Sequence, residues 1–263
     1  MSEQNFDLFR AELSGKVVLV TGGGSGIGAA IAEAFWRQGA RVAIHYHHSD
    51  KQDISALAQR ICAAGGEALS LQADFGSSPE VTATVAKAIA HFGRLDILVN
   101  NAGSMIARRT LEEVDDDFIE QVFALNARSV VTACRAALPI FTLQGAGCII
   151  NVSSISARTG GSPGSSIYSA SKAFVSTLTR SLARELAERN IRVNAISPGT
   201  IDTAFHELFS NREKLEKTRV GIPLQRLGEP NDCAGTALYL ACPSLSGYVT
   251  GQVIEINGGQ LMA

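Results

Sequence analysis

Short apolar runs alternate along the chain with longer stretches in which apolar residues recur at helical spacing. The apolar runs predict strands over residues 16–21, 41–46, 67–72, 95–99, 148–152, 192–196 and 252–256. The helical spacing predicts helices over residues 26–38, 51–64, 79–91, 115–143, 167–189 and 230–241, with Pro139 interrupting the fourth. Strands that are apolar throughout are typical of a parallel sheet with helices on both faces. The pattern therefore predicts a doubly wound α/β fold around a parallel seven-stranded sheet.

Length and composition fit a single globular unit. No linker or repeat divides the 263 residues, so we predict one domain over 1–263 with an N-terminal extension at 1–14. Hydrophobic residues make up 46% and charged residues 18%, which excludes disorder over most of the chain. Lys and Arg total 23 against 25 Asp and Glu, a net charge of −2. We therefore expect neither a nucleic-acid partner nor an anionic membrane surface.

The cysteine pattern and the N-terminal residues indicate in which cellular compartment the protein is expected. The five cysteines are scattered without a C-x-x-C pair, so reduced thiols are expected rather than disulfides or a zinc site. The first sixteen residues contain acids and lack the apolar centre of a signal peptide. No apolar run approaches the ~18 residues of a membrane span. We expect a soluble, cytoplasmic protein.

Residues 21–28, Thr-Gly-Gly-Gly-Ser-Gly-Ile-Gly, join the first predicted strand to the first predicted helix. Gly22, Gly26 and Gly28 permit a tight turn, close approach of a pyrophosphate and close packing of the helix on the sheet. The helix start, with Ser25 and Ile27, offers unpaired N–H groups and a positive dipole end to phosphates. A plain glycine turn is the alternative, but the flanking strand and helix favour a dinucleotide site.

Further motifs follow in a fixed order. They are Asn-Asn-Ala-Gly at 100–103, Asn-Val-Ser-Ser at 151–154, Tyr-Ser-Ala-Ser-Lys at 168–172, Asn194, and Pro-Gly at 198–199. With the glycine turn, they make the chain resemble the short-chain dehydrogenase/reductase family over about residues 16–259. The resemblance includes 3-oxoacyl-acyl-carrier-protein reductase-like and glucose dehydrogenase-like members. It implies a Rossmann-type fold and hydride transfer between an NAD(P) cofactor and a ketone or secondary alcohol.

Tyr168 and Lys172 stand four residues apart in a predicted helix, so they share one face. A phenol of pKa ~10 is a poor base, and lowering that pKa by about three units requires ~4 kcal/mol. An ammonium ~4 Å away supplies about that much at an effective dielectric constant of ~20. We predict that Tyr168 is the acid/base and that Lys172 lowers its pKa; a cation–π or packing pair is the alternative.

The resemblance adds two further catalytic candidates and a second role for Lys172. It assigns the substrate-oxygen donor to the second serine of the Asn-Val-Ser-Ser motif, Ser154 rather than Ser153. Asn126 matches an asparagine that positions a water next to the lysine, and a locally bonded helix asparagine is the alternative. Lys172 is also implied to hold the ribose hydroxyls of the nicotinamide.

The resemblance also implies the cofactor contacts. Asp74 matches an acid that contacts the adenine amine, although a helix N-cap is nearly as good an interpretation. Thr203 matches a threonine that binds the nicotinamide amide, and it could instead cap the next helix. The remaining implied contacts are Asn100, Ala102, Gly103, Pro198, Gly199 and Ile201.

The choice of cofactor depends on the end of the second strand. NAD preference usually rests on an acid there, and this chain has Tyr46 instead. His47 and Ser49 can donate hydrogen bonds to a 2′-phosphate, and Tyr-x-x-Ser resembles NADP-using members of the family. Ser25 stands where many such members place Arg or Lys, so NAD(H) use stays possible. We predict that NADP(H) is preferred.

Several alternatives stay open. A 3-oxoacyl-thioester (acyl-carrier-protein) reductase is one, although residues 141–147 carry none of the basic side chains expected for an acidic carrier. A catalytically silent nucleotide-sensing protein and a non-redox lyase or isomerase are others. Neither the acidic run 112–117 nor the histidines near residue 47 offers convergent metal ligands, so no metal is predicted. The apolar, glycine-rich run 246–259 at the sheet edge predicts a homotetramer.

Overall fold

The computed structural model describes residues 3–47, 51–209 and 212–262. Its centre is a parallel sheet of seven strands in the order β3-β2-β1-β4-β5-β6-β7. The predicted fold class is therefore confirmed. The strands are β1 (Val17–Val20), β2 (Arg41–Tyr46), β3 (Ala68–Gln72), β4 (Ile97–Asn100), β5 (Gly147–Val152), β6 (Ile191–Pro198) and β7 (Val253–Ile256).

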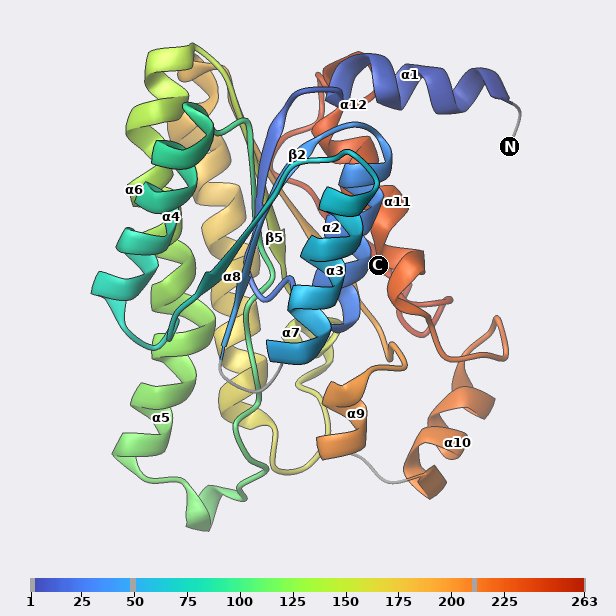
Figure 1. Cartoon of the computed structure of the whole chain (residues 1–263). Coiled ribbons are helices and arrows are strands. Elements are labelled where there is room, and N and C mark those ends of the chain that lie inside the picture. The colour runs from blue at the N-terminus through green and yellow to red at the C-terminus, as the bar shows by residue number, and fades with distance from the viewer. Residues whose placement is uncertain (1–2, 48–50, 210–211, 263) are drawn as a thin grey trace.

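Helices cover both faces of the sheet (Figure 1). One layer contains α2 (Gly26–Arg37), α3 (Lys51–Ala63) and α11 (Pro230–Ala241). The other contains α4 (Ser78–Phe92), α6 (Ser129–Gln144) and α8 (Ser166–Leu186). The shorter helices are α1 (Glu3–Leu13), α5 (Asp116–Phe123), α7 (Ser156–Thr159), α9 (Ala204–Phe209), α10 (Arg212–Gly221) and α12 (Pro243–Ser246).

The two layers enclose two hydrophobic cores because successive strand residues point to opposite faces. In β1, Val18 and Val20 join the core beneath α2, while Val17 and Leu19 join the core beneath α4. All four side chains are fully buried, which explains the uninterrupted apolar run in the sequence. Among the described helices, none has the length and apolar character needed to cross a bilayer.

The predicted helix over 115–143 differs most from the structure. It is divided into α5, a π-helical turn Ala124–Arg128 and α6. Pro139 lies inside α6 without ending it, because Ala137 and Phe141 are fully buried and their packing holds the helix across the proline. Helices α1, α9 and α10 lie outside the predicted ranges, although α9 is the helix that directly follows Thr203, as the cap alternative for that residue requires.

Candidate active site

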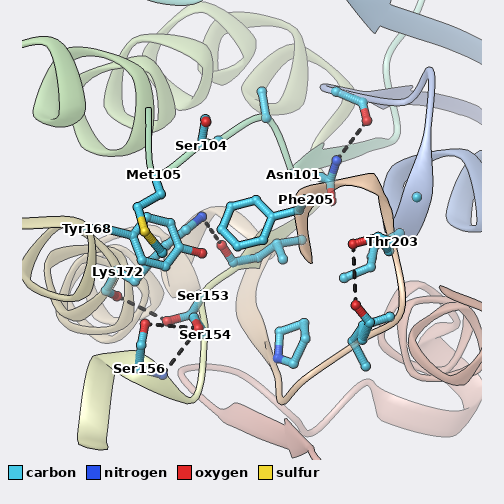
Figure 2. A pocket seen from close by; sticks show the side chains of 18 of the residues that line it. Asn101, Ser104, Met105, Ser153, Ser154, Ser156, Tyr168, Lys172, Thr203 and Phe205 are labelled. Atoms are coloured by element: carbon cyan, nitrogen blue, oxygen red, sulfur yellow. Dashed lines mark hydrogen bonds between the residues drawn. The ribbon is translucent and has the colours of Figure 1, made fainter. Parts of the chain in front are cut away.

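A cleft of about 730 Å³ opens at the carboxyl ends of the strands, where the strand order reverses between β1 and β4. Open α/β sheets bind ligands at this place, and the volume is that of a small-molecule site. Figure 2 shows Tyr168, Lys172 and Ser154 gathered at one side of the cleft, with Thr203 at the other. The cleft thus brings together segments that are widely separated in the sequence.

The glycine turn forms one end of the cleft, lined by Gly22, Ser25, Gly26 and Ile27. Gly22 and Gly26 have φ of +61° and +50°, where side chains are strained. The N-cap residue of α2, Ser25, makes no side-chain cap bond, so the first N–H groups of the helix stay available. A Cβ on Gly28 would collide with the Gly22 carbonyl, so this glycine lets the first turn of α2 lie against the glycine turn. These features fit a dinucleotide pyrophosphate.

His45 supports the turn from β2, and the sequence analysis gave it no role. Its Nδ1 accepts the Gly22 N–H at 3.1 Å, and its Nε2 lies 3.1 Å from the Ala73 carbonyl. A carbonyl can only accept, so the ring is neutral with its proton on Nε2. The ring stacks on Phe75 at 3.6 Å between centroids, and burial lowers the pKa of His45 to about 4.

Asn101 ties the glycine turn to the end of β4. Its Nδ2 donates to the carbonyls of Thr21 and Gly22 at 3.0 and 2.9 Å. Asn101, Ala102 and Gly103 line the cleft. The prediction that Asn100 lines it is wrong: that side chain is 3% exposed and donates to Asn151 inside the core. The strand pleat sends these two neighbouring asparagines to different sides.

Tyr168 and Ser154 lie together in the cleft. Ser154 Oγ accepts hydrogen bonds from the N–H and the hydroxyl of Ser156 at 3.1 and 3.0 Å. Its own proton is therefore left for Tyr168 or a substrate oxygen. Ser153, by contrast, is buried and bonds to the Lys172 carbonyl and Ser176. Ser156 was missed by the sequence analysis.

The pKa of Tyr168 departs from the prediction. Burial raises the pKa of Tyr168 to about 12, and the hydrogen bond with Ser154 offsets only part of that rise. Lys172 Nζ donates to the Val152 carbonyl at 2.8 Å and lies 5.9 Å from the centre of the Tyr168 ring. The predicted lowering by Lys172 is therefore wrong for the protein by itself, in which the phenol is neutral at pH 7.

Lys172 and Asn126 meet beneath Gly103. Lys172 is 3% exposed, and burial lowers its pKa to about 8. Asn126, in the π-helical turn, is fully buried; its Nδ2 donates to the carbonyls of Ser104 and Val122, and its Oδ1 accepts the Ser104 N–H. A Cβ on Gly103 would lie 2.6 Å from Asn126 Oδ1 and 3.1 Å from Lys172 Nζ. Asn126 thus fixes the segment after β4 next to the lysine.

The other predicted cofactor residues divide into two groups. Tyr46, His47 and Asp74 line the cleft at the ends of β2 and β3. Asp74 is exposed and accepts the Gly76 N–H, whereas the N-cap of α4 is Ser77, so the N-cap alternative for Asp74 is wrong. Ser49 lies outside the described residues. Pro198, Gly199, Ile201 and Thr203 line the cleft after β6, with the Thr203 hydroxyl donating to the Ile201 carbonyl.

Two side chains of the acidic run 112–117 cap helix ends. Asp115 accepts the Phe118 N–H at 2.7 Å as the N-cap of α5, and Glu113 forms a capping box with Thr110. The described residues contain no group of three or more His, Cys, Asp or Glu side chains able to hold a metal ion.

Comparison with known proteins identifies the family. The family model described as enoyl-(acyl carrier protein) reductase matches residues 22–260. The 3-oxoacyl-(acyl-carrier-protein) reductase FabG of Staphylococcus aureus is 39% identical over 251 residues, covering 94% of this chain and 98% of that protein.

Two solved structures are similar over nearly the whole chain. The NADH-dependent reductase A1-R′ complexed with NAD has a TM-score of 0.85 at 33% identity, covering 97% of this chain and all of that one. A blue fluorescent protein from a metagenomic library, in complex with NADPH, has a TM-score of 0.88 at 36% identity, covering 95% and 100%. The chain therefore belongs to the short-chain dehydrogenase/reductase family and is an NAD(P)-dependent oxidoreductase acting on CH–OH and C=O groups.

Proposed function

We propose that the protein is an NADP(H)-preferring oxidoreductase that interconverts a ketone and a secondary alcohol, with Tyr168 as the acid/base. The observation that carries the proposal is that one cleft is lined by both the glycine turn and the set Ser154, Tyr168 and Lys172. A catalytically silent nucleotide sensor would need only the first of these features. The nicotinamide cofactor, when bound, supplies the hydride that the carbonyl carbon receives.

The residues of the chain donate the proton and stabilise the charge that develops on the substrate oxygen. In the reductive direction, neutral Tyr168 donates its phenolic proton to the substrate oxygen. The raised pKa of Tyr168 keeps that proton in place at pH 7. Ser154, whose oxygen already accepts two hydrogen bonds from Ser156, donates its proton to the same oxygen. Lys172 Nζ is held by Val152 and has further N–H groups for ribose hydroxyls.

NADP preference is supported by the charges at the adenosine end of the cleft. Asp74, after β3, is the carboxylate among the described lining residues, and position 46 at the end of β2 is a tyrosine. A 2′-phosphate near Tyr46 and His47 therefore meets no carboxylate on that strand. We expect NADPH to bind about ten- to a hundredfold more tightly than NADH, or ~1.4 to 2.8 kcal/mol. Titration of cofactor fluorescence at neutral pH measures this, and tighter binding of NADH contradicts the preference.

Turnover is tested with NADPH or NADH and a panel of ketones, following the loss of absorbance. Tyr168→Phe is expected to abolish turnover while cofactor binding persists, because only the ionisable oxygen is removed. Ser154→Ala is expected to slow turnover by about 10²- to 10³-fold, the size of one lost oxyanion donor. Lys172→Ala is expected to damage both rate and cofactor affinity. Near-normal turnover by Tyr168→Phe would refute the assignment of the proton donor.

Reduction of a 3-oxoacyl thioester is the second candidate, favoured by the 39% identity to FabG. Acetoacetyl-coenzyme A and an acetoacetyl-carrier protein, compared with simple ketones of the same chain length, separate the two activities. A preference of more than about tenfold in kcat/KM for the carrier-bound substrate would favour this candidate. Absence of turnover with every substrate, together with tight cofactor binding, would favour a nucleotide sensor.

We also propose that the chain acts as a single-domain homotetramer in the cytoplasm. Strand β7 is an edge of the sheet with half-buried residues, and apolar side chains are exposed on the long helices at Val131, Leu143 and Phe174. Exposed edges and patches of this kind favour two-fold pairing with another copy. Light scattering that gave the monomer mass of 27.7 kDa at micromolar concentration would contradict the tetramer. The five cysteines are free, as a reducing compartment requires.

A further inference from the structure

Arg108 lines the cleft, yet the hydride and proton transfers proposed above give it no task. It lies between β4 and the 3₁₀ turn Leu111–Glu113 and is half-buried. Its Nε donates to the Phe209 carbonyl at 2.7 Å, and its Nη1 donates to the Pro163 carbonyl at 3.1 Å. A guanidinium has five N–H groups. The Nη2 group therefore keeps both protons for a further acceptor, since it makes no hydrogen bond within the described chain.

The charge of Arg108 also has no carboxylate partner among the side chains that the structure describes. Its neighbour Arg109 pairs with Asp115 at 2.8 Å outside the cleft, whereas no carboxylate of the described residues lies within 4 Å of Arg108. Partly buried cations are usually paired. A second cation, Lys214, is close enough that the charge of Arg108 adds to the effect of burial in lowering the pKa of Lys214. Arg108 therefore brings a positive charge to the lining of the cleft.

Arg108 joins two segments that flank Tyr168. Phe209 ends α9, and Phe205 of the same helix packs against Tyr168 with ring centroids 5.8 Å apart. Pro163 belongs to the segment that connects Ser154 to Tyr168. The lining of the cleft also includes hydroxyl groups, at Ser156, Thr159, Ser162, Ser165 and Thr218, beside apolar side chains such as Met105 and Phe205. A guanidinium whose Nη2 group has no acceptor among the described residues gives this mixed lining one group suited to a small anion.

We propose that Arg108 binds a carboxylate of the substrate, so that the substrate class is a small oxo acid and its hydroxy-acid product. This inference rests on the proposed ketone reduction at Tyr168. The free edge of a guanidinium matches a carboxylate, and such charge-assisted hydrogen bonds are among the stronger ones in proteins. Asp74, the acid lining the cleft, lies at the adenosine end and does not repel a carboxylate held near Arg108.

The test compares each acid with its own methyl ester: 3-oxobutanoate, 4-oxopentanoate and 5-oxohexanoate, all with saturating NADPH. Wild type, Arg108→Gln and Arg108→Lys are measured, with Arg109→Gln as the matched control. We expect Arg108→Gln to lower kcat/KM for at least one acid by about 10- to 100-fold. Its effect on the ester should stay within about threefold. Arg108→Lys should be intermediate, and Arg109→Gln should behave as wild type.

The outcomes separate this inference from the proposed function. Wild type that reduces every ester at least as well as its acid would overturn the carboxylate site and leave ketone reduction intact. Equal losses for acid and ester in Arg108→Gln would also overturn it, since Arg108 would then only hold α9 and the 163 segment. If no turnover is detected, calorimetry measures the binding of the same acids and esters to the cofactor-loaded protein. Arg108-dependent binding of the acid alone would support the site while the proposed reaction fails, and equal binding of both would overturn it.

Discussion

The bond between His45 and Gly22 predicts an acid-labile support beneath the glycine turn. His45 is 2% exposed, and its neutral ring accepts the Gly22 N–H while its Nε2 faces the Ala73 carbonyl. Protonation of Nδ1 would replace that acceptor with a donor. His45→Asn is the informative substitution, because the amide oxygen of asparagine can accept the Gly22 N–H but does not titrate.

The size of the effect follows from the pKa of His45, which burial lowers from 6.5 to about 4. The nearby charges of His47, Asp74 and Glu80 act less strongly than burial. Each pKa unit is worth about 1.4 kcal/mol, so the neutral ring contributes about 3 kcal/mol to stability above pH 6.5. That contribution declines as the pH falls below 6.5, because the unfolded chain binds the proton first, and it is lost below about pH 4.

Urea unfolding at pH 7.5 and pH 4.5, at one fixed protein concentration, measures the difference. Wild type should lose about 2 to 3 kcal/mol more than His45→Asn between the two pH values. Carboxylates that titrate in this range are common to both proteins, so their effects cancel in the comparison. The absolute stability of His45→Asn at pH 7.5 is expected to be lower, since the stacking on Phe75 is lost. Equal acid-induced losses in the two proteins would refute the reasoning.

Two further predictions concern packing and thiols. Gly103→Ala should lower kcat by about 10- to 100-fold, because the new Cβ pushes on Asn126 and Lys172. Gly235→Ala, which meets nothing within 4 Å, is the control, and equal activity of both variants would contradict the steric argument. In the native protein, Cys62 alone should react rapidly with an aromatic disulfide, because the other four cysteines are buried and burial raises their pKa to about 11 or 12. Cys62→Ser should remove that fast phase, and a second fast thiol in wild type would contradict the burial.

The sequence by itself determined the layered fold. The strand over 41–46 and the helix over 230–241 were predicted with the bounds that the structure has. Strands buried on both faces must be apolar throughout, and the helices between them must present one apolar side, so the pattern is local and readable. The glycine turn was readable for a similar reason, because glycine is the residue type that tolerates the positive φ found at Gly22 and Gly26.

Only the tertiary structure decided which polar side chains face the cleft. Asn100 and Asn101 are adjacent and of the same residue type, so nothing local distinguishes the one that enters the core. The π-helical turn at Asn126 depends on bonds to Ser104, a residue 22 positions earlier in the chain. Arg108 is unremarkable in sequence beside Arg109, yet one faces the cleft and the other pairs with Asp115.

The electrostatics of the site also required the tertiary structure. The four-residue spacing correctly places Tyr168 and Lys172 on one helix face, and both line the cleft. It does not determine the surroundings: the Val152 carbonyl holds the Lys172 ammonium, and burial raises rather than lowers the pKa of Tyr168. Secondary structure follows from interactions between residues close in sequence. A pKa depends on desolvation and on charges from distant segments, and these exist only once the chain has folded.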